Sequence, residues 1–405
     1  MSIQHAKNRM NDQVNNLIKK GVKIPNPETV DIGEEVDINR ISGNGVILYS
    51  GSKIFGESTL ILQNSKIGFE GPVTLDNCFT GPQVELKSGF FSKAVFLQKA
   101  SMGSGAHVRE GTILEENASA AHTVALKQTI LFPFVTLGSL INFCDCFMSG
   151  GTSRKDHSEV GSSYIHFNYT PEQDKATPSL IGDVPHGVML DQRPIFLGGQ
   201  GGLVGPRRLA FGTVIAAGTI CRKDETRENR LILPHALKGG SIPFLPGRYK
   251  NKKKIIRNNI IYIANLIALR EWYRHVRSMF VSDNFPDALL SGLKQNMDLA
   301  LSERVKKLKE VCLKKPESDL YTSWPMIEEI LTDKKYHKGN AGLRDNFLER
   351  IHSIIVQAGK DYISVIKNSG AADKAKGTAW LKGIVDNITL KISEPEQTGT
   401  KLNAF

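Results

Sequence analysis

The sequence contains few cysteines, and their positions exclude two kinds of small stabilised fold. Five occur in 405 residues: Cys78, Cys144, Cys146, Cys221 and Cys312. No two of them form a Cys-x-x-Cys pair and an odd number cannot all be paired, so neither a zinc finger nor a disulfide framework is expected. Free thiols are typical of a reducing compartment. The sequence therefore predicts a cytoplasmic protein without a metal site.

Long apolar runs are also absent. The most apolar run, residues 260–269, has about half of the roughly 20 residues that are needed to cross a bilayer. Residues 1–20 lack the apolar centre and the small-residue cleavage site of a signal peptide. We therefore expect no transmembrane segment and no export signal.

Nucleic-acid-binding motifs are missing, although the formal net charge is +11. The sequence has no helix-turn-helix pattern, no pair of RNA-stacking aromatics and no zinc finger, so nucleic acid is not an expected partner. Acidic or phosphorylated small molecules fit the same charge. The 40% apolar and 23% charged residues are typical of a globular protein and exclude a disordered or fibrous chain.

What the sequence does contain is a six-residue repeat. An apolar residue recurs at every sixth position, with Gly, Ala, Thr and polar residues in between. The three runs are Ile61, Ile67, Val73 and Phe79; Phe96, Met102, Val108 and Leu114; and Leu197, Leu203, Leu209, Ile215 and Cys221. The three runs are not separated from one another by multiples of six residues, so loops must lie between them.

A period of six fits neither an amphipathic helix nor a simple alternating strand. It predicts a parallel β-solenoid in which each side is one short strand and one turn, and three sides make a coil of about eighteen residues. The recurring apolar side chains point inward, and small residues allow tight turns. A β-sandwich of short strands is the alternative fold.

Composition divides the chain into four parts. Residues 1–28 carry a polar helical pattern that ends at two prolines and predicts a linker helix. Residues 29–248 carry the repeat and are predicted to form the β-helix. Glycine then becomes rarer, and residues 249–391 show helical spacing with breaks, which predicts an α-helical domain. Residues 392–405 are predicted to be a flexible tail.

Three stretches make the prediction more specific. Residues 15–38, segments within residues 142–183, and residues 196–224 resemble the acetyltransferase half of the bacterial bifunctional N-acetylglucosamine-1-phosphate uridyltransferase and glucosamine-1-phosphate acetyltransferase. The resemblance implies a left-handed parallel β-helix that forms a homotrimer with active sites between subunits. The sequence has no glycine-rich nucleotide loop like that of the uridyltransferase half. We therefore expect no uridyltransferase or pyrophosphorylase activity from this chain.

The resemblance also implies an acyl-CoA co-substrate and a histidine base. Acyl transfer to an amine needs a base for the amine proton and a donor for the oxyanion. His157 matches the catalytic histidine of the family through the lysine before it and the glycine after it, although the spacing to that glycine is one residue shorter. His166 is the second candidate for the base. In the structural alternative, both histidines only form turns.

Three further residues match substrate-binding positions of the family. Asn168 and Tyr169 match a pair that lies along donor and acceptor, and Lys175 matches a lysine on the loop that reaches the neighbouring subunit's site. Ile-Gly-Asp follows at residues 181–183, in register with the family pattern. Asn168 could instead belong only to a turn, because asparagine and proline are common in turns.

The predicted coenzyme A site combines small residues with cations. Ala216, Ala217 and Gly218 are small enough for the pantetheine arm to approach the backbone. Two basic pairs are candidates for the phosphates, although they could equally be solubilising charges on turns. These pairs are Arg207 with Arg208, and Arg222 with Lys223.

Departures from the family pattern limit the choice of acceptor. The family's phosphate-holding arginine is missing within residues 133–139, its lysine is replaced by an apolar residue within residues 142–148, and its serine near the acyl carbonyl corresponds to Gly199. Glucosamine 1-phosphate is therefore not the expected acceptor. The sequence predicts an acyltransferase that uses acetyl-CoA or another acyl-CoA. Its acceptor would be an amino sugar or sugar nucleotide of UDP-N-acetylglucosamine-related or cell-envelope metabolism.

Two other functions share features with this sequence. Loss of the substrate cations favours a non-catalytic β-helix that binds a nucleotide sugar or serves as an assembly scaffold, whereas the retained His157, Asn168, Tyr169 and Lys175 favour the enzyme. A β-helical carbonic anhydrase needs three histidines on zinc, two of them closely spaced. His157 and His166 are nine residues apart, so this function is not expected.

Overall fold

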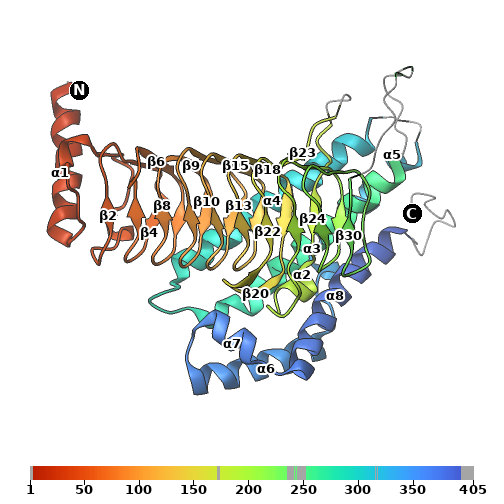
Figure 1. Cartoon of the computed structure of the whole chain (residues 1–405). Coiled ribbons are helices and arrows are strands. Elements are labelled where there is room, and N and C mark those ends of the chain that lie inside the picture. The colour runs from red at the N-terminus through yellow and green to blue at the C-terminus, as the bar shows by residue number, and fades with distance from the viewer. Residues whose placement is uncertain are drawn as a thin grey trace.

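The computed structural model describes residues 3–170, 174–234, 241, 243, 252–314, 316 and 318–393. In this part of the chain, parallel strands form a three-sided solenoid, and α-helices follow it (Figure 1). The predicted fold class is therefore confirmed. None of the described helices is long and apolar enough to span a bilayer.

Three parallel sheets, named A, B and C here, form the sides of the solenoid. Among the described residues, sheets A and B have ten strands each and sheet C has eight. Sheet A consists of β2 (Ile47–Leu48), β5 (Lys66–Ile67), β8 (Glu85–Leu86), β11 (Ser101–Met102), β14 (Ser119–Ala120), β17 (Thr136–Leu137), β22 (Glu159–Val160), β25 (Phe196–Leu197), β28 (Val214–Ile215) and β30 (Leu231–Ile232).

The other two sheets complete the triangular section. Sheet B consists of β1 (Asp31–Ile32), β3 (Lys53–Phe55), β6 (Val73–Asp76), β9 (Gly89–Ser92), β12 (Ala106–Val108), β15 (Val124–Lys127), β18 (Ile141–Cys144), β23 (Ile165–Phe167), β26 (Gly202–Val204) and β29 (Ile220–Cys221). Sheet C consists of β4 (Leu60–Ile61), β7 (Phe79–Thr80), β10 (Ala94–Phe96), β13 (Thr112–Leu114), β16 (Ile130–Leu131), β19 (Cys146–Met148), β24 (Ser179–Ile181) and β27 (Arg208–Leu209).

The six-residue repeat corresponds to one side of the solenoid per step. Leu197, Leu203 and Leu209 lie in β25, β26 and β27 of three different sheets, and Leu197 pairs with Ile215 one coil later. All four side chains are buried. Phe79 differs from the prediction, because it pairs with Leu60 on the outer face of sheet C. The coil between Leu60 and Phe79 has one residue more than three periods of six, which shifts the frame.

The helices from α3 on follow the solenoid in sequence, and α3 and α4 cover its sheet C face (Figure 1). α4 contacts β7, β10 and β13, and α3 contacts β24. The helices are α1 (Ile3–Lys20), α2 (Val184–Gly187), α3 (Lys252–His275), α4 (Asp287–Cys312), α5 (Asp319–Thr332), α6 (Ala341–Ala358), α7 (Tyr362–Asn368) and α8 (Ala371–Ser393), with the short 3-10 helices η1 (Pro27–Thr29), η2 (Ile38–Arg40), η3 (Arg277–Phe280) and η4 (Lys334–Tyr336).

Apolar residues on both faces of sheet C explain why this side is covered. In β4, β10 and β16, adjacent side chains are all buried, whereas β2, β8 and β11 of sheet A bury only alternate ones. Burying one large aliphatic or aromatic side chain contributes about 1.5–3 kcal/mol. The continuous outer stripe of sheet C therefore anchors α3 and α4 to the solenoid.

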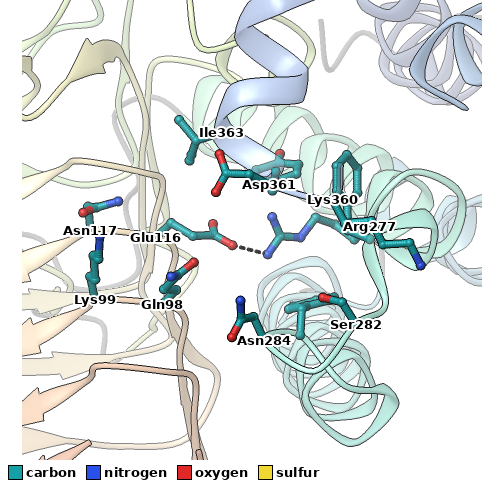
Figure 2. A pocket seen from close by; sticks show the side chains of 13 residues that line it. Gln98, Lys99, Glu116, Asn117, Arg277, Ser282, Asn284, Lys360, Asp361 and Ile363 are labelled. Atoms are coloured by element: carbon teal, nitrogen blue, oxygen red, sulfur yellow. Dashed lines mark hydrogen bonds and ion pairs between the residues drawn. The ribbon is translucent and has the colours of Figure 1, made fainter. Parts of the chain in front are cut away.

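A network of charged and aromatic side chains reinforces the contact between the helical region and the solenoid at one edge of sheet C. Arg277 of η3 forms a 2.5 Å ion pair with Glu116 of the solenoid (Figure 2), and its guanidinium lies 3.8 Å from the Tyr362 ring centre. Both charged side chains are buried. Replacing either partner would leave the other buried charge unpaired, which costs about 3–5 kcal/mol. The pair therefore fixes the helical region against the solenoid.

Candidate functional site

The candidate residues His157, Asn168, Tyr169 and Lys175 lie in two insertions at different corners of the solenoid, whereas the candidate His166 lies in β23. The corners AB, BC and CA are named here for the two sheets that each turn connects. Residues 149–158 at corner CA contain the hairpin of β20 (Gly151–Ser153) and β21 (Asp156–His157). The other insertion lies at corner BC between β23 and β24, and its described residues are 168–170 and 174–178. These insertions interrupt otherwise short turns.

The hairpin holds His157 against the rim of sheet A. Gly151 pairs with His157 and has a φ of +97°, and a Cβ there would lie 2.5 Å from the His157 Cα. Arg154 at the hairpin tip donates hydrogen bonds to the Asn117 carbonyl at 3.0 Å and to the Thr136 hydroxyl at 3.0 Å. Glycine at 151 and arginine at 154 thus position the imidazole. These two supporting residues were not identified from the sequence.

His157 opens into a cleft of about 560 Å³. Its Nε2 atom lies 3.9 Å from Oε2 of Glu159, and its Nδ1 atom is buried without a hydrogen-bond partner among the described residues. The cleft is also lined by Asp156, Asp191 and Arg193. Asp191 is paired with Lys374 at 3.5 Å. The other two carboxylates still outnumber the one guanidinium in the lining, and this excess of negative charge favours a cationic group such as a protonated amine.

His166 occupies an inward position of sheet B. It pairs with Leu203, its side chain is 2% exposed, and its Nε2 lies 2.7 Å from the Ser179 hydroxyl. Burial lowers the pKa of His166 from 6.5 to about 4. The imidazole is therefore neutral near pH 7 and lies inside the coil, away from the His157 cleft.

The predicted substrate-binding residues lie on the corner BC loop. Tyr169 and Lys175 are exposed, and Asn168 is half-buried. The Asn168 side chain hydrogen-bonds to Asp145, whose pKa is raised by burial and lowered in turn by Arg304 and Asn168. Asn168 therefore contacts the solenoid through Asp145 and is also partly exposed at the surface.

Two helices of the C-terminal region hold this loop. Arg304 of α4 forms a buried 2.9 Å ion pair with Asp145 and donates to the Lys175 carbonyl at 3.4 Å. The Asn259 amide of α3 donates to the Ala176 carbonyl at 2.8 Å. The helical region thus fixes the base of the loop. Sequence analysis missed Arg304 because its partner is distant in sequence.

Ala216, Ala217 and Gly218 form a turn at corner AB. Ala217 and Gly218 are exposed and Ala216 is half-buried. A Cβ at Gly218 would have no atom within 4 Å, so the space in front of this turn is open. The turn offers an accessible backbone edge of small residues. Its contact with a pantetheine arm stays a prediction.

The predicted phosphate-binding cations lie at corner BC. Arg207 is half-buried and donates to the Pro206 carbonyl at 2.5 Å, and Arg222 and Lys223 are exposed one coil later. Arg208 begins β27 and faces α3 at the end of sheet C. These cations are at a different corner from Ala216–Gly218.

One chain therefore does not bring the candidate residues together. His157 lies at corner CA, Tyr169 and Lys175 lie at corner BC, and Ala216–Gly218 lies at corner AB. Each set of residues is accessible from a different corner of the three-sided solenoid. Any site that uses all three sets must include residues of more than one chain.

A second cavity, of about 440 Å³, lies at corner CA between the solenoid and the helical region. Figure 2 shows Gln98, Lys99 and Asn117 on one side and Ser282 and Asn284 on the other. The Arg277–Glu116 ion pair lies at its base. No group of three or more His, Cys, Asp or Glu side chains that could hold a metal ion occurs in the described ranges.

Comparisons with known proteins support the resemblance seen in the sequence. No protein-family model matches the chain. The chain is similar to "Bifunctional protein GlmU" of Thermotoga maritima, with 27% identity over 213 residues, which are 52% of this chain and 42% of that protein. "Bifunctional protein GlmU" of Trichlorobacter lovleyi is 24% identical over 226 residues, which are 55% of this chain and 44% of that protein. The predicted resemblance is confirmed, and the chain spans less than half of the length of these relatives.

The chain also aligns with solved structures. The study titled "Crystallographic analysis of the polysialic acid O-acetyltransferase OatWY" concerns a protein with 14% sequence identity, and the alignment covers 56% of this chain and 87% of that chain. The TM-score is 0.17, which is too low to show that the two chains share an overall arrangement.

Proposed function

We propose that this protein is an acyl-CoA-dependent acyltransferase that N-acylates an amino sugar or a sugar nucleotide. The observation that carries the proposal is the His157 cleft, where an imidazole and three carboxylates face the same space beside an insertion that the solenoid itself does not need. The resemblance to "Bifunctional protein GlmU" supports acetyl-CoA as the donor. It also supports a cytoplasmic role in UDP-N-acetylglucosamine-related or envelope metabolism.

His157 is the proposed general base. The bound ammonium group first loses one proton to solvent. The free amine nitrogen then attacks the thioester carbonyl carbon while His157 removes a second proton from it, so that the new C–N bond gives a tetrahedral oxyanion. The oxyanion then collapses, the C–S bond breaks, and the protonated imidazole returns its proton to the leaving sulfur. The products are an amide and the free thiol of coenzyme A. His166 is neutral and enclosed, and we assign it to packing of the coil.

The charge of the cleft supports an acceptor without a phosphate near the reacting nitrogen. Asp156, Glu159 and Asp191 outnumber Arg193 in the lining. They attract an ammonium group and repel a phosphate. This agrees with the missing phosphate-holding arginine and lysine noted in the sequence.

The remaining candidate residues are proposed to act across a subunit boundary in a homotrimer. Outward side chains are apolar and exposed on the last coils of the uncovered sheets. They are Phe196, Val214 and Leu231 on sheet A, and Ile165, Phe167 and Ile220 on sheet B. Adjacent exposed apolar patches on two sides favour burial by copies of the chain. Association could then place Tyr169 and Lys175 of one chain beside His157 of another.

The test of the activity is thiol release from acetyl-CoA with a panel of amino sugars, sugar phosphates and nucleotide amino sugars. We expect turnover with one acceptor class, loss of at least about 100-fold in His157→Ala, and no such loss in His352→Ala, an exposed histidine of α6. If no acceptor gives turnover and calorimetry detects no acetyl-CoA binding, the chain is instead a non-catalytic scaffold.

The test of assembly is the mass of the protein in solution, measured by light scattering. We expect a trimer, and a shift to monomer in Phe196→Glu or Ile220→Glu, because each places a charge on one of the two exposed patches. Lys66→Gln, an exposed position on an early coil, serves as the control. A wild-type monomer would contradict the shared site.

A further inference from the structure

A separate cleft of about 480 Å³ lies where the beginning of α3 meets the last coils of the solenoid. Four of its lining residues are cations: Arg208 from β27 and Lys253, Lys254 and Arg257 from α3. Asp224 is the one carboxylate in this described lining. The cleft is at the sheet C side, whereas the His157 cleft opens at corner CA.

Asp224 forms an ion pair with one of these cations, Lys254. Its Oδ2 atom lies 3.2 Å from Nζ of Lys254, and both carboxylate oxygens accept hydrogen bonds from the buried Asn258 amide at 3.2 and 3.3 Å. Oδ1 also accepts from the Arg208 backbone N–H at 3.3 Å. The carboxylate is therefore fully committed to the protein.

Three cations remain without a carboxylate. Within the described ranges, no hydrogen bond or ion pair engages the side chains of Arg208, Lys253 or Arg257. Burial lowers the pKa of Arg208 and the charge of Arg257 lowers it further, while Asp224 and Asp183 oppose the shift without reversing it. An arginine stays protonated in proteins, so this partly buried positive charge favours a bound anion.

Neighbouring residues do not supply that anion. Asp183 is committed to the His186 backbone N–H and to its imidazole, both at 2.9 Å. Residues 235–251, which lead into α3, contain no Asp or Glu in their sequence. The excess positive charge is therefore a property of this part of the chain.

The sequence of α3 adds two unfavourable features that an anion would relieve. Lys253 and Arg257 are four residues apart on the helix, and like charges at this spacing repel each other. The first turn of α3 has no acidic residue and carries several lysines, although a helix N-terminus has a positive end of the dipole. Both features become favourable when a negative group occupies the adjacent cleft.

We propose that this cleft binds a phosphate group, contributed by a soluble phosphorylated compound or by an anionic lipid headgroup. Arg208 and Arg257 would contact the phosphate oxygens through their planar guanidinium groups, and Lys253 would add a point charge. Arg208 was also a candidate for the coenzyme A phosphates, whereas Lys253 and Arg257 of α3 were not. The test of this proposal has a readout separate from acyl transfer.

The test is calorimetric titration of the full-length protein with pyrophosphate, in parallel with sedimentation on phosphatidylcholine vesicles with and without phosphatidylglycerol. We expect one pyrophosphate site per chain and about tenfold or greater weakening in Arg257→Gln and Lys253→Gln. Arg350→Gln on α6, which removes an exposed arginine paired with Asp373, is the matched control and should bind as the wild type does. Circular dichroism checks that each variant is folded.

The outcomes separate the two sources. Pyrophosphate binding that is lost in the α3 variants supports a soluble ligand, and vesicle binding alone that is lost in the same variants supports a lipid headgroup. The proposal is overturned if neither probe binds the wild type at low salt, or if Arg350→Gln weakens binding as much as Arg257→Gln. Thiol release reports separately on the acyltransferase.

Discussion

The Tyr273 hydroxyl donates a 2.6 Å hydrogen bond to Oε1 of Glu115, and this bond joins α3 to a corner of the solenoid. Burial raises the pKa of Glu115 from 4.5 to about 7, although the Arg277 charge opposes the shift. Glu115 and Glu116 are adjacent in sequence and both lie near Arg277, so two acids share one guanidinium. Contact between the regions therefore depends on protonation.

We expect Glu115→Gln to change the pH dependence of stability. The folded state holds the Glu115 proton more tightly than the unfolded state, so its contribution is present below pH 4.5 and is lost as the pH rises towards about 7. The glutamine keeps an acceptor for Tyr273 and removes the charge. Urea unfolding at pH 5 and pH 8 should show a smaller drop for the variant. An equal drop in both proteins would contradict the assignment.

His166 makes stability depend on pH in the opposite direction. Its folded pKa is about 4, against 6.5 for the ordinary group, so the unfolded state binds more protons between these values and stability falls as the pH falls through that window. The full shift corresponds to about 3 kcal/mol. His166→Gln can keep a partner for Ser179 and removes the titration. The difference in unfolding free energy between variant and wild type should therefore grow in favour of the variant from pH 7 to pH 4.

We expect Arg277→Met to destabilise the protein by about 3–5 kcal/mol, because Glu116 is left buried without its partner. The double variant Arg277→Met with Glu116→Gln should recover most of this loss, because it removes both charges. The coupling free energy between Arg277 and Glu116 follows from the unfolding free energies of Arg277→Met, Glu116→Gln and the double variant, each compared with the wild type. If the double variant is no better than Arg277→Met alone, packing of Arg277 between the aromatic rings accounts for the cost.

The apolar repeat made the solenoid predictable. Leu197, Leu203 and Leu209 have the same spacing because each coil needs one inward side chain per side, so local sequence determines the fold. The paired apolar residues of sheet C, such as Val95 beside Phe96, also contained the signal that one face is covered. That signal was missed because only the inward positions were counted.

The candidate site was harder to predict, because its geometry depends on residues distant in sequence. His166 and His157 are both histidines near polar residues, and only the register of β23 with β26 shows that one points inward. Arg304 could not be linked to Asp145 by any local pattern, since 159 residues separate the two positions. The proposed site combines residues from three corners of the solenoid and therefore requires more than one chain. Local sequence patterns do not show how the chains associate.

Gly292 on α4 tests how closely the helices approach sheet C. A Cβ at this position would lie 2.5 Å from ring atoms of Phe79. We therefore expect Gly292→Ala to destabilise the protein by about 1–3 kcal/mol through overpacking. Gly383→Ala on α8, where a Cβ would meet no atom within 4 Å, is the matched control and should be neutral or slightly stabilising. Thermal unfolding of both variants measures the difference.

Arg304 links the helical region to the loop that carries Asn168 and Lys175. Its guanidinium pairs with Asp145 at 2.9 Å inside the protein and also contacts the Lys175 carbonyl. We expect Arg304→Met to leave Asp145 unpaired and to release the base of the loop. Hydrogen exchange should then accelerate in residues 166–170 and 174–179, while exchange in the early coils stays unchanged.

The double variant Arg304→Met with Asp145→Asn separates charge from positioning. Removing both charges should restore most of the global stability, as for any buried pair, but the loop would still lack its contact at Lys175. We therefore expect near wild-type unfolding together with fast exchange in the loop. If acyl transfer is observed, the same variant should raise KM more than it lowers kcat, because Asn168 and Lys175 are proposed to bind substrate and His157 is untouched. Slow exchange in the loop of the double variant would show that Asn259 alone holds it.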